Sequence, residues 1–258
     1  RVVAMDLGQI DLAIEDGSFF DNASLLEFIA KVKAAKGTAH LIGLVSDGGV
    51  HGHIRHMQAA IKAITDAGVP VAIHALTDGR DVAPTSSYGY MNILTEGLPA
   101  GAKIASVTGR YFAMDRDNRW ERVAEAYRAM IKGEGHHSVD AHGAITAADN
   151  RSESDEFISA TVIGDYAGVQ DGDGVFCLNF RADRAREILA AIGDPAFDSF
   201  ETGPRPKLSA MLGMVEYSDA HNAYMSCVFP SRDIVNTFGE WVSKKGKRQF
   251  HLAETEKY

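Results

Sequence analysis

Short apolar runs separate longer stretches in which apolar residues recur every three or four positions. The runs at 39–46, 71–76 and 103–107 are bounded by glycine-rich or polar sequence and predict buried strands. The periodic stretches between them predict amphipathic helices. Because strands that alternate with helices of this length form βαβ crossovers, the pattern predicts an α/β fold: a three-layer, mainly parallel sheet with helices on both faces.

Residues that start and stop helices agree with this alternation. Asp21 or Asn22 can cap a helix that closes at Gly37. Later helices are expected through 54–64, around 88–94 and around 119–131, and glycines follow the first and the last of them.

The alternation is lost between residues 135 and 173, where small and polar residues dominate. We expect an excursion there at the surface or rim, with one short helical stretch near 152–158. The alternation then returns, with strands expected at 175–180, 207–215 and 249–253 and helices at 182–192 and 233–243.

Composition and charge narrow the class of partner. The chain has 258 residues, 45% of them hydrophobic, which is ordinary for a folded globule. Its net charge of -9 disfavours binding to nucleic-acid phosphates and to anionic membrane surfaces. No apolar stretch approaches the roughly 18 to 20 residues of a membrane span, and no signal-peptide pattern opens the chain, so a cytoplasmic location is expected. Cys177 and Cys227 lie in apolar runs and are expected to be buried small hydrophobes.

Polar, glycine-containing segments follow the first three predicted strands: SDGGVHGH, TDGRD and TGRYFAMDRDNR. A fourth strand, VFCLNF, runs directly into RADRAR. Ligands of open α/β sheets bind beyond the carboxyl ends of the strands. Side chains from these four segments are therefore expected to converge: Asp47, His51, Arg80, Asp81, Arg110, Arg116, Arg181 and Arg184.

Five arginines around one site would suit a small ligand with more than one anionic group. The guanidinium group stays protonated and offers two parallel hydrogen bonds to a phosphate or carboxylate. The alternative is that each arginine only pairs with a nearby acid such as Asp81, Asp115, Asp117 or Asp183, which is less plausible for all five together than for any one.

Asp81 and His51 are the candidate proton carriers. Asp81 could accept a proton from a substrate hydroxyl and return it, or it could merely orient Arg80 or a loop amide. His51 could donate to a carboxylate or relay a proton, or it could cap the following helix. A metal site built from His51, His53 and His56 is not expected, because their spacing is weak and no matching acid or cysteine cluster follows. No P-loop, dinucleotide fingerprint or GxSxG elbow is present in the sequence.

Several of these segments resemble, in order, signature segments of the cofactor-independent phosphoglycerate mutases, members of the alkaline phosphatase superfamily. The segments are SDGGVHGHIRH, ALTDGRD, GRYFAMDRDNRWERV, LNFRADRAREI, GMVEY and AETEKY. With LAIEDGSFF near the start, the resemblance spans essentially the whole chain. Phosphopentomutases and other metal hydrolases of the superfamily lack the combination of GRYFAMDRDNRW and NFRADR.

The resemblance implies a role for each matching residue. Enzymes of this family interconvert 3-phosphoglycerate and 2-phosphoglycerate through a phosphoserine, without 2,3-bisphosphoglycerate. A phosphatase domain carries the serine and two divalent metal ions, usually Mn²⁺, and an inserted phosphotransferase domain grips the substrate. By resemblance, His51, Arg80, Asp81, Arg110 and Arg116 hold the glycerate, with catalytic Asp81 handling hydroxyl protons. Arg181 and Arg184 meet the phosphate, and Lys257 lies beside the phosphoserine.

The resemblance covers only the phosphotransferase part. We expect residues 1–20 to be a linker from the phosphatase domain, 21–243 to be the phosphotransferase domain and 244–258 to be a return segment. The chain opens at Arg1 and contains nothing like the serine or metal-ligand segments, so we expect a fragment that binds substrate but does not turn it over. A monomer is expected. The alternative hypothesis is a non-catalytic module that binds small anions such as phosphate or carboxylate.

Overall fold

An eight-stranded sheet forms the centre of the molecule. The structure, a computed structural model, describes residues 4–232, 234–250 and 252. The strand order is β4-β5-β3-β2-β1-β6-β7-β8, and the strand pairs are parallel except for β3 with β5. The strands are β1 Ala39–Leu44, β2 Val71–Thr77, β3 Ala102–Gly109, β4 His136–Ser138, β5 Thr161–Ile163, β6 Gly174–Cys177, β7 Ala210–Val215 and β8 Ser226–Phe229.

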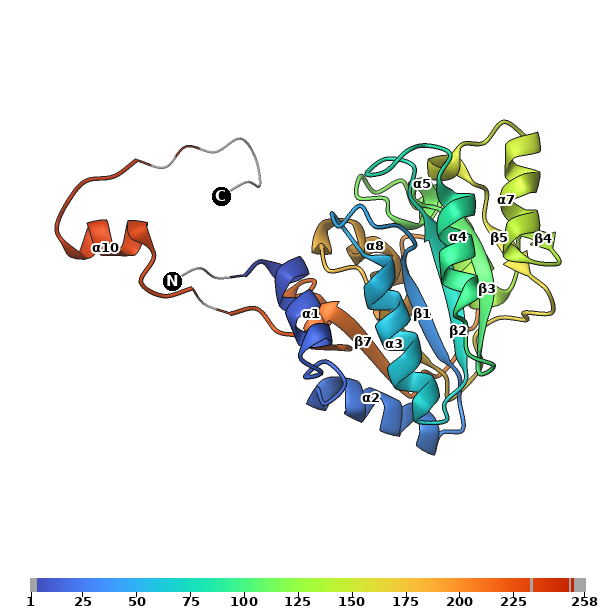
Figure 1. Cartoon of the computed structure of the whole chain (residues 1–258), viewed down its shortest axis with the longest axis horizontal. Helices are drawn as coiled ribbons and strands as arrows, with labels where there is room; N and C mark the ends of the chain where they lie inside the picture. The colour runs from blue at the N-terminus through green and yellow to red at the C-terminus, as the bar shows by residue number, and fades with distance from the viewer. Residues whose placement is uncertain (1–3, 233, 251, 253–258) are drawn as a thin grey trace.

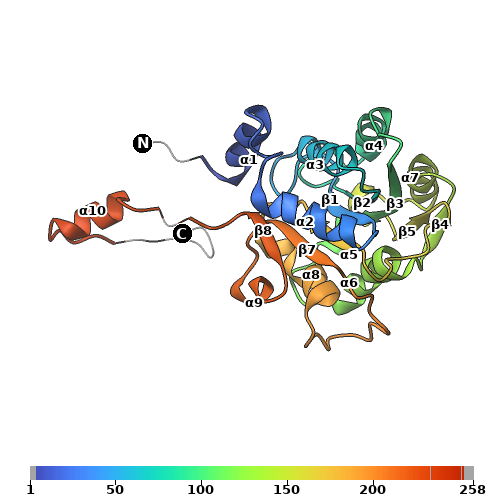
Figure 2. The ribbon, with the colours of Figure 1, turned by 90° about the horizontal axis from the view of Figure 1, so that it is seen from below.

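Helices cover both faces of this sheet, which confirms the predicted three-layer α/β class. Figure 2 shows α3, α4 and α7 on one side and α6 and α8 on the other. The α-helices are α1 Asp6–Glu15, α2 Ala23–Ala34, α3 Ile54–Asp66, α4 Ser87–Glu96, α5 Arg110–Ala113, α6 Trp120–Tyr127, α7 Ala141–Asn150, α8 Arg186–Gly193, α9 Asp219–Asn222 and α10 Phe238–Lys244. Shorter turns are the π-helical η1 Arg128–Lys132 and the 3-10 turns η2 Asp155–Phe157 and η3 Ala182–Arg184.

Local sequence explains how α2 begins and which face it buries. The Asn22 side chain accepts hydrogen bonds from the backbone of Ser24 at 3.0 Å and Leu25 at 3.2 Å, which satisfies donors that the first turn leaves open. Leu25, Phe28 and Val32 recur at helical spacing and are buried against the sheet. Each such apolar side chain stabilises the fold by about 2 kcal/mol when fully buried.

The segment from 135 to 173 lies at one edge of the sheet, in keeping with the predicted excursion at the surface or rim, but it is more regular than the sequence predicts. It contributes β4, α7 and β5, and thereby adds two strands to one edge of the sheet. The expected helical stretch at 152–158 is only the three-residue turn η2. The buried face of α7 consists largely of alanines, among them Ala144 and Ala148, and both strands have three residues. Such short, weakly apolar elements give little periodic signal.

The C-terminal prediction is also partly wrong. The helix expected at 233–243 begins only at Phe238, where Thr237 caps α10 by accepting from the backbone of Glu240. Gln249 and Phe250 are irregular rather than part of a strand, and residues 251 and 253–258 lie outside the described residues. Figure 1 shows α10 well apart from the sheet and its covering helices.

The first twenty residues carry a helix that the sequence does not predict. Ile10 of α1 and Phe19 after it are fully buried. The division at residues 20 and 243 stays a prediction. None of the helices within the described ranges is both long and apolar enough to cross a membrane.

Candidate functional site: an arginine cluster at the carboxyl edge of the sheet

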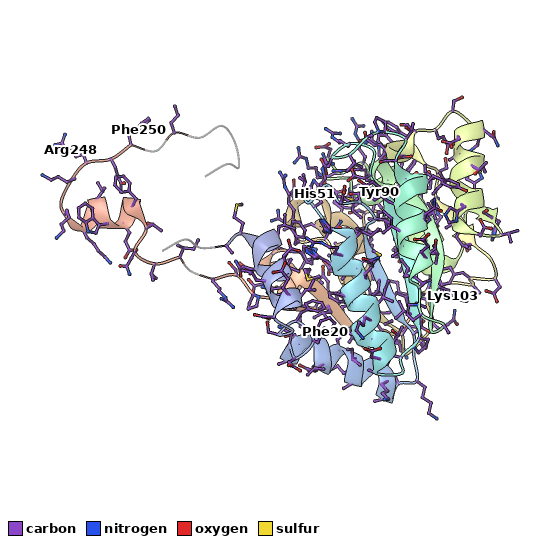
Figure 3. The ribbon with its side chains drawn as sticks, in the orientation of Figure 1. Phe20, His51, Tyr90, Lys103, Arg248 and Phe250 are labelled. Atoms are coloured by element: carbon purple, nitrogen blue, oxygen red, sulfur yellow. The ribbon has the colours of Figure 1, made fainter. Side chains whose placement is uncertain are left out.

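Four neighbouring parallel strands place the predicted site residues together, beyond the carboxyl ends of these strands. Strands β3, β2, β1 and β6 are adjacent and run in the same direction, so the segments that follow them leave the sheet on the same side. Figure 3 shows His51 and Tyr90 near this edge and Lys103, at the start of β3, near the opposite one. The Tyr90 hydroxyl donates to Asp47 in the loop after β1.

Arg110 lies at the centre of a buried ion-pair network. Its Nη1 donates to Asp78 Oδ1 at 2.7 Å and to Asp81 Oδ2 at 2.5 Å. Asp78 also accepts from the Ser46 hydroxyl at 2.6 Å, which links the loops after β1, β2 and β3. Burial alone would raise the pKa of Asp78, but hydrogen bonds from Asp81, Ser46 and Arg110 outweigh it and lower that pKa.

Asp183 joins three of the predicted binding side chains. Its Oδ2 accepts from Arg116 Nη1 at 2.7 Å, and its Oδ1 lies 3.2 Å from Arg181 Nε. The same Oδ1 is 3.8 Å from Nδ1 of the buried His51. Residues far apart in the sequence therefore meet at one carboxylate.

The remaining two arginines have different kinds of partner. Arg80 Nη1 donates to Glu156 Oε1 of η2 at 3.2 Å, whereas Arg184 Nη1 donates to the Met114 carbonyl at 3.0 Å. Among the described residues, Arg184 has no carboxylate partner within ion-pair distance. Burial and then the nearby guanidinium groups of Arg116, Arg110 and Arg80 lower the pKa of Arg184.

Pairing with local acids, the alternative to ligand binding, is thus realised for four of the five arginines. Each guanidinium group is nevertheless held through a single nitrogen by the side chains and carbonyls of the described residues: Arg80, Arg110, Arg116, Arg181 and Arg184. We call these five residues the arginine cluster. The other nitrogens of each group remain available as donors to an anion.

His51 is neutral at physiological pH. Burial and then the charge of Arg110 lower its pKa to about 4. It does not cap the following helix, because His53 is the N-cap of α3 and accepts from the backbone of Arg55. His51 is instead tied to the segment after β6, where the Phe180 backbone donates to its carbonyl at 2.7 Å.

Two carboxyl groups anchor the segment that carries Arg116. Asp115 accepts from two backbone N–H groups at 2.9 Å and from Arg122 Nη1 at 3.1 Å. Glu187 of α8 accepts from the backbone of Asn118 at 3.0 Å. Burial, and secondarily the charge of Asp115, raise the pKa of Glu187 to about 7 although the Asn118 hydrogen bond opposes them.

Glu187→Gln is expected to stabilise the protein at alkaline pH, where the wild type must carry a charge on the partly buried Glu187. Because the folded-state pKa of Glu187 is raised above 4.5, its contribution is complete below that pH and is lost as the pH rises through about 7. Allowing for solvent screening of this half-buried group, the variant should be more stable by about 1–2 kcal/mol at pH 8. Urea unfolding of both proteins at pH 4.5 and pH 8 tests this. An equal difference at both pH values would contradict it.

No metal centre is apparent in the part of the chain that the structure describes. No three His, Cys, Asp or Glu side chains gather there in a way that could hold a metal ion. His56 is buried and pairs with Asp11 at 3.0 Å instead of joining His51. Of the predicted site residues, Lys257 lies outside the described residues.

A cavity of about 740 Å³ lies away from the arginine cluster, by the first residues of β7 and β8. Its two cationic side chains already have partners, since Lys31 pairs with Glu27 at 2.7 Å and Arg205 donates to the carbonyls of Asp194 and Phe197. We place the candidate site at the arginine cluster, because charge complementarity to a small anion requires available cations.

Of the carboxylates that hold the cluster, sequence reasoning named Asp81 and Asp183 as possible partners of the arginines but missed Asp78 and Glu156. Asp78 follows β2 directly, so its position was a signal. Glu156 gave no such signal in the sequence, because it lies in the segment from 135 to 173, whose elements were not predicted.

The fold and site define an α/β domain with an arginine cluster at the carboxyl edge of a parallel sheet. The family model described as the BPG-independent PGAM N-terminus matches residues 10–219. The chain therefore belongs to the family of BPG-independent phosphoglycerate mutases and corresponds to their N-terminal region, as the sequence resemblance predicts.

Similar proteins agree with this assignment. The chain is 71% identical over 258 residues to the 2,3-bisphosphoglycerate-independent phosphoglycerate mutase of Ruegeria pomeroyi, and 64% identical to that of Paracoccus denitrificans. All of this chain but only 51% of either relative is covered, so the chain spans about half their length. A crystal structure of Leishmania mexicana phosphoglycerate mutase at low cobalt concentration matches with a TM-score of 0.83 and 29% identity, over 95% of this chain and 48% of that one.

Proposed function

We propose that this chain is the substrate-gripping part of an enzyme that interconverts 3-phosphoglycerate and 2-phosphoglycerate through a phosphoserine. The observation that carries the proposal is the arginine cluster, five guanidinium groups at one edge, each held through one nitrogen. Family membership supports the same activity, because the curated relatives are named as phosphoglycerate mutases.

The substrate carries two anionic groups, and the cluster offers cations for both. His51, Arg80, Asp81, Arg110 and Arg116 would hold the glycerate, and Arg181 and Arg184 the phosphate, while Lys257 would lie beside the phosphoserine. Available N–H donors of these groups can form parallel charge-assisted hydrogen bonds with carboxylate and phosphate oxygens. Fixing both ends of so small a molecule leaves its hydroxyl in one place, which favours transfer at a defined oxygen.

Asp81 is the catalytic residue in this proposal. When a phosphoryl group moves from the serine to the substrate hydroxyl, that hydroxyl loses its proton, and the Asp81 carboxylate accepts it. In the preceding half of the cycle, when the phosphoryl group leaves the other substrate oxygen for the serine, protonated Asp81 donates a proton to that oxygen, so each turnover restores Asp81 to its starting state. Arg110, which donates to Asp81 at 2.5 Å, holds the carboxylate in place during both steps.

The complete enzyme would use two divalent metal ions, Mn²⁺ among them, and no 2,3-bisphosphoglycerate. Such ions supply a Lewis acid for phosphoryl transfer when bound. The described residues of this chain offer no group that fits them, so we derive no step through a metal here. We further propose a cytoplasmic monomer that binds neither nucleic acid nor membranes, in keeping with its net charge of -9.

Calorimetric titration of this chain at low salt tests the binding part of the proposal. We expect 3-phosphoglycerate to bind more tightly than inorganic phosphate or glycerate alone, because only it occupies both halves of the cluster. Absence of binding of all three would contradict the proposal. Equal binding of phosphate and 3-phosphoglycerate would favour a non-catalytic anion-binding module instead.

Turnover requires a polypeptide of the relatives' full length that contains this chain. Mutase activity is expected in that protein, and Arg181→Ala should abolish it. The exposed Arg128 of η1 provides a matched control, since Arg128→Ala removes an arginine outside the cluster. Equal activity of the two variants would contradict the assigned role of Arg181.

A further inference from the structure

We propose that Asp183 is a positioning residue that orients Arg116, Arg181 and His51 toward one ligand. The inference rests on the proposed function and adds to it a carboxylate that does not itself bind the substrate. Asp183 is 15% exposed and meets all three side chains, which come from segments after three different strands.

The contacts to the arginines leave at least one terminal nitrogen of each guanidinium group available to a ligand. Asp183 lies 3.2 Å from Nε of Arg181, the nitrogen nearest the aliphatic stem, so both terminal nitrogens can still form a fork around an oxyanion. It engages Arg116 through Nη1 alone. A carboxylate that merely occupied the place of a ligand would instead take up the terminal nitrogens of both groups.

The contact to His51 is incomplete in the described structure. His51 Nδ1 and Asp183 Oδ1 are both buried and have no hydrogen-bond partner among the described residues, yet they are 3.8 Å apart. The charge of Asp183 Oδ1 is balanced by Arg181 Nε at 3.2 Å, whereas a buried His51 Nδ1 without a hydrogen bond costs about 1–3 kcal/mol. A small movement would bring them within hydrogen-bond distance, and ligand contacts to Arg181 can drive it.

Completion of that hydrogen bond would also fix the state of the imidazole. If Nδ1–H donates to Asp183, a neutral His51 has an unprotonated Nε2, which can accept from a substrate hydroxyl. The backbone bond from Phe180 to His51, 2.7 Å long, already ties the two segments together, so only side chains need to move. Asp183 thus couples the phosphate-binding arginine to the group that faces the glycerate.

Asp183→Asn, which keeps the size but removes the charge, tests the inference by calorimetry on this chain. We expect a roughly 10- to 100-fold loss of affinity for 3-phosphoglycerate, as for a lost charge-assisted positioning contact. Affinity for inorganic phosphate should be unchanged or higher, because a negative charge has been removed. Asp165→Asn is the matched control, because Asp165 is 94% exposed and its one ion-pair partner in the described part of the chain is Lys103. The control should bind like the wild type.

Other results separate the alternatives. Unchanged 3-phosphoglycerate affinity in Asp183→Asn would overturn the positioning role and leave the proposed function standing, whereas a wild type that binds no 3-phosphoglycerate would overturn both. Equal losses for both ligands together with lower unfolding stability would indicate a merely structural residue. If Asp183→Asn bound 3-phosphoglycerate and inorganic phosphate more tightly by the same factor, Asp183 would instead compete with the ligand for the arginines, and the positioning role would be overturned.

A second measurement does not depend on the variant. Nitrogen NMR of the wild-type chain with 3-phosphoglycerate should show the Nδ1-protonated tautomer of His51. A ligand-bound His51 that is protonated only at Nε2 would overturn the inference. This test remains decisive even if Asp183→Asn fails to fold.

Discussion

Arg184→Met is expected to reduce the affinity of this chain for 3-phosphoglycerate by about two to three orders of magnitude. Removing one partner from a desolvated charge pair typically costs about 2–5 kcal/mol, which is about 30-fold to several thousand-fold in affinity. The loss for Arg184→Met should lie in the middle of this range rather than at its low end, because Arg184 is the cluster arginine without a carboxylate partner among the described residues. Its charge is therefore the least neutralised within the protein. Calorimetric titration at low salt measures the effect.

The stability of this variant provides the second half of the prediction. Arg184 is crowded by other guanidinium groups, which together with burial lower its pKa. Without ligand, Arg184→Met should therefore unfold at the same or a higher urea concentration than the wild type. Arg80→Met is the comparison within the cluster, since Arg80 is 57% exposed and paired with Glu156, and it should weaken binding less. Similar losses of affinity in both variants would contradict the special position of Arg184.

Arg110→Met is expected to lower the free energy of unfolding by about 3–5 kcal/mol. The side chain of Arg110 is 3% exposed, and its removal leaves Asp78, 2% exposed, as an unpaired buried charge beside Asp81. Breaking a buried ion pair by removing one member typically has this cost. Urea denaturation at pH 7 measures it. A loss below about 1 kcal/mol would show that the network is not a stability element.

Two controls identify the cause of that loss. Asp78→Asn in the Arg110→Met background should restore part of the stability, because it removes the uncompensated charge. The deficit of Arg110→Met should also shrink as the pH falls. In the wild type, the hydrogen bond and charge of Arg110 help to lower the folded-state pKa of Asp78, so this part of the stability is present at neutral pH and is lost as the pH falls. A deficit independent of pH would point to lost packing instead.

The sequence predicts the central part of the fold because its signals are strong there. The runs that form β1, β2 and β3 are apolar and have glycine-rich or polar sequence on both sides, and each is followed by a polar segment. Adjacency of these strands with β6 then brings the arginines together, as general rules for parallel sheets predict. The elements α7 and β5 were missed because alanine-rich helices and three-residue strands carry little hydrophobic periodicity.

The pairing of each arginine could not be predicted from the sequence. Contacts such as Arg80 with Glu156 or Arg116 with Asp183 join residues from separate segments, and their geometry depends on how those segments pack. Asp117 and Asp115 were equally plausible partners for Arg116 on sequence grounds, since they flank it. Only the three-dimensional arrangement distinguishes them.

The adjacency of the four strands also sets the dimensions of what can be held. Neighbouring strands lie about 4.8 Å apart, so β3 and β6, three steps from one another, are separated by roughly 14 Å. The three-carbon acid proposed above as the substrate spans much less than that, so long side chains from both sides of the site would have to bridge the remaining distance. This gives a geometric reason why arginine, which has a long side chain, supplies the contacts from both sides, rather than histidine or a backbone amide. A shorter side chain at any of these positions would fail to reach the ligand, whatever its charge.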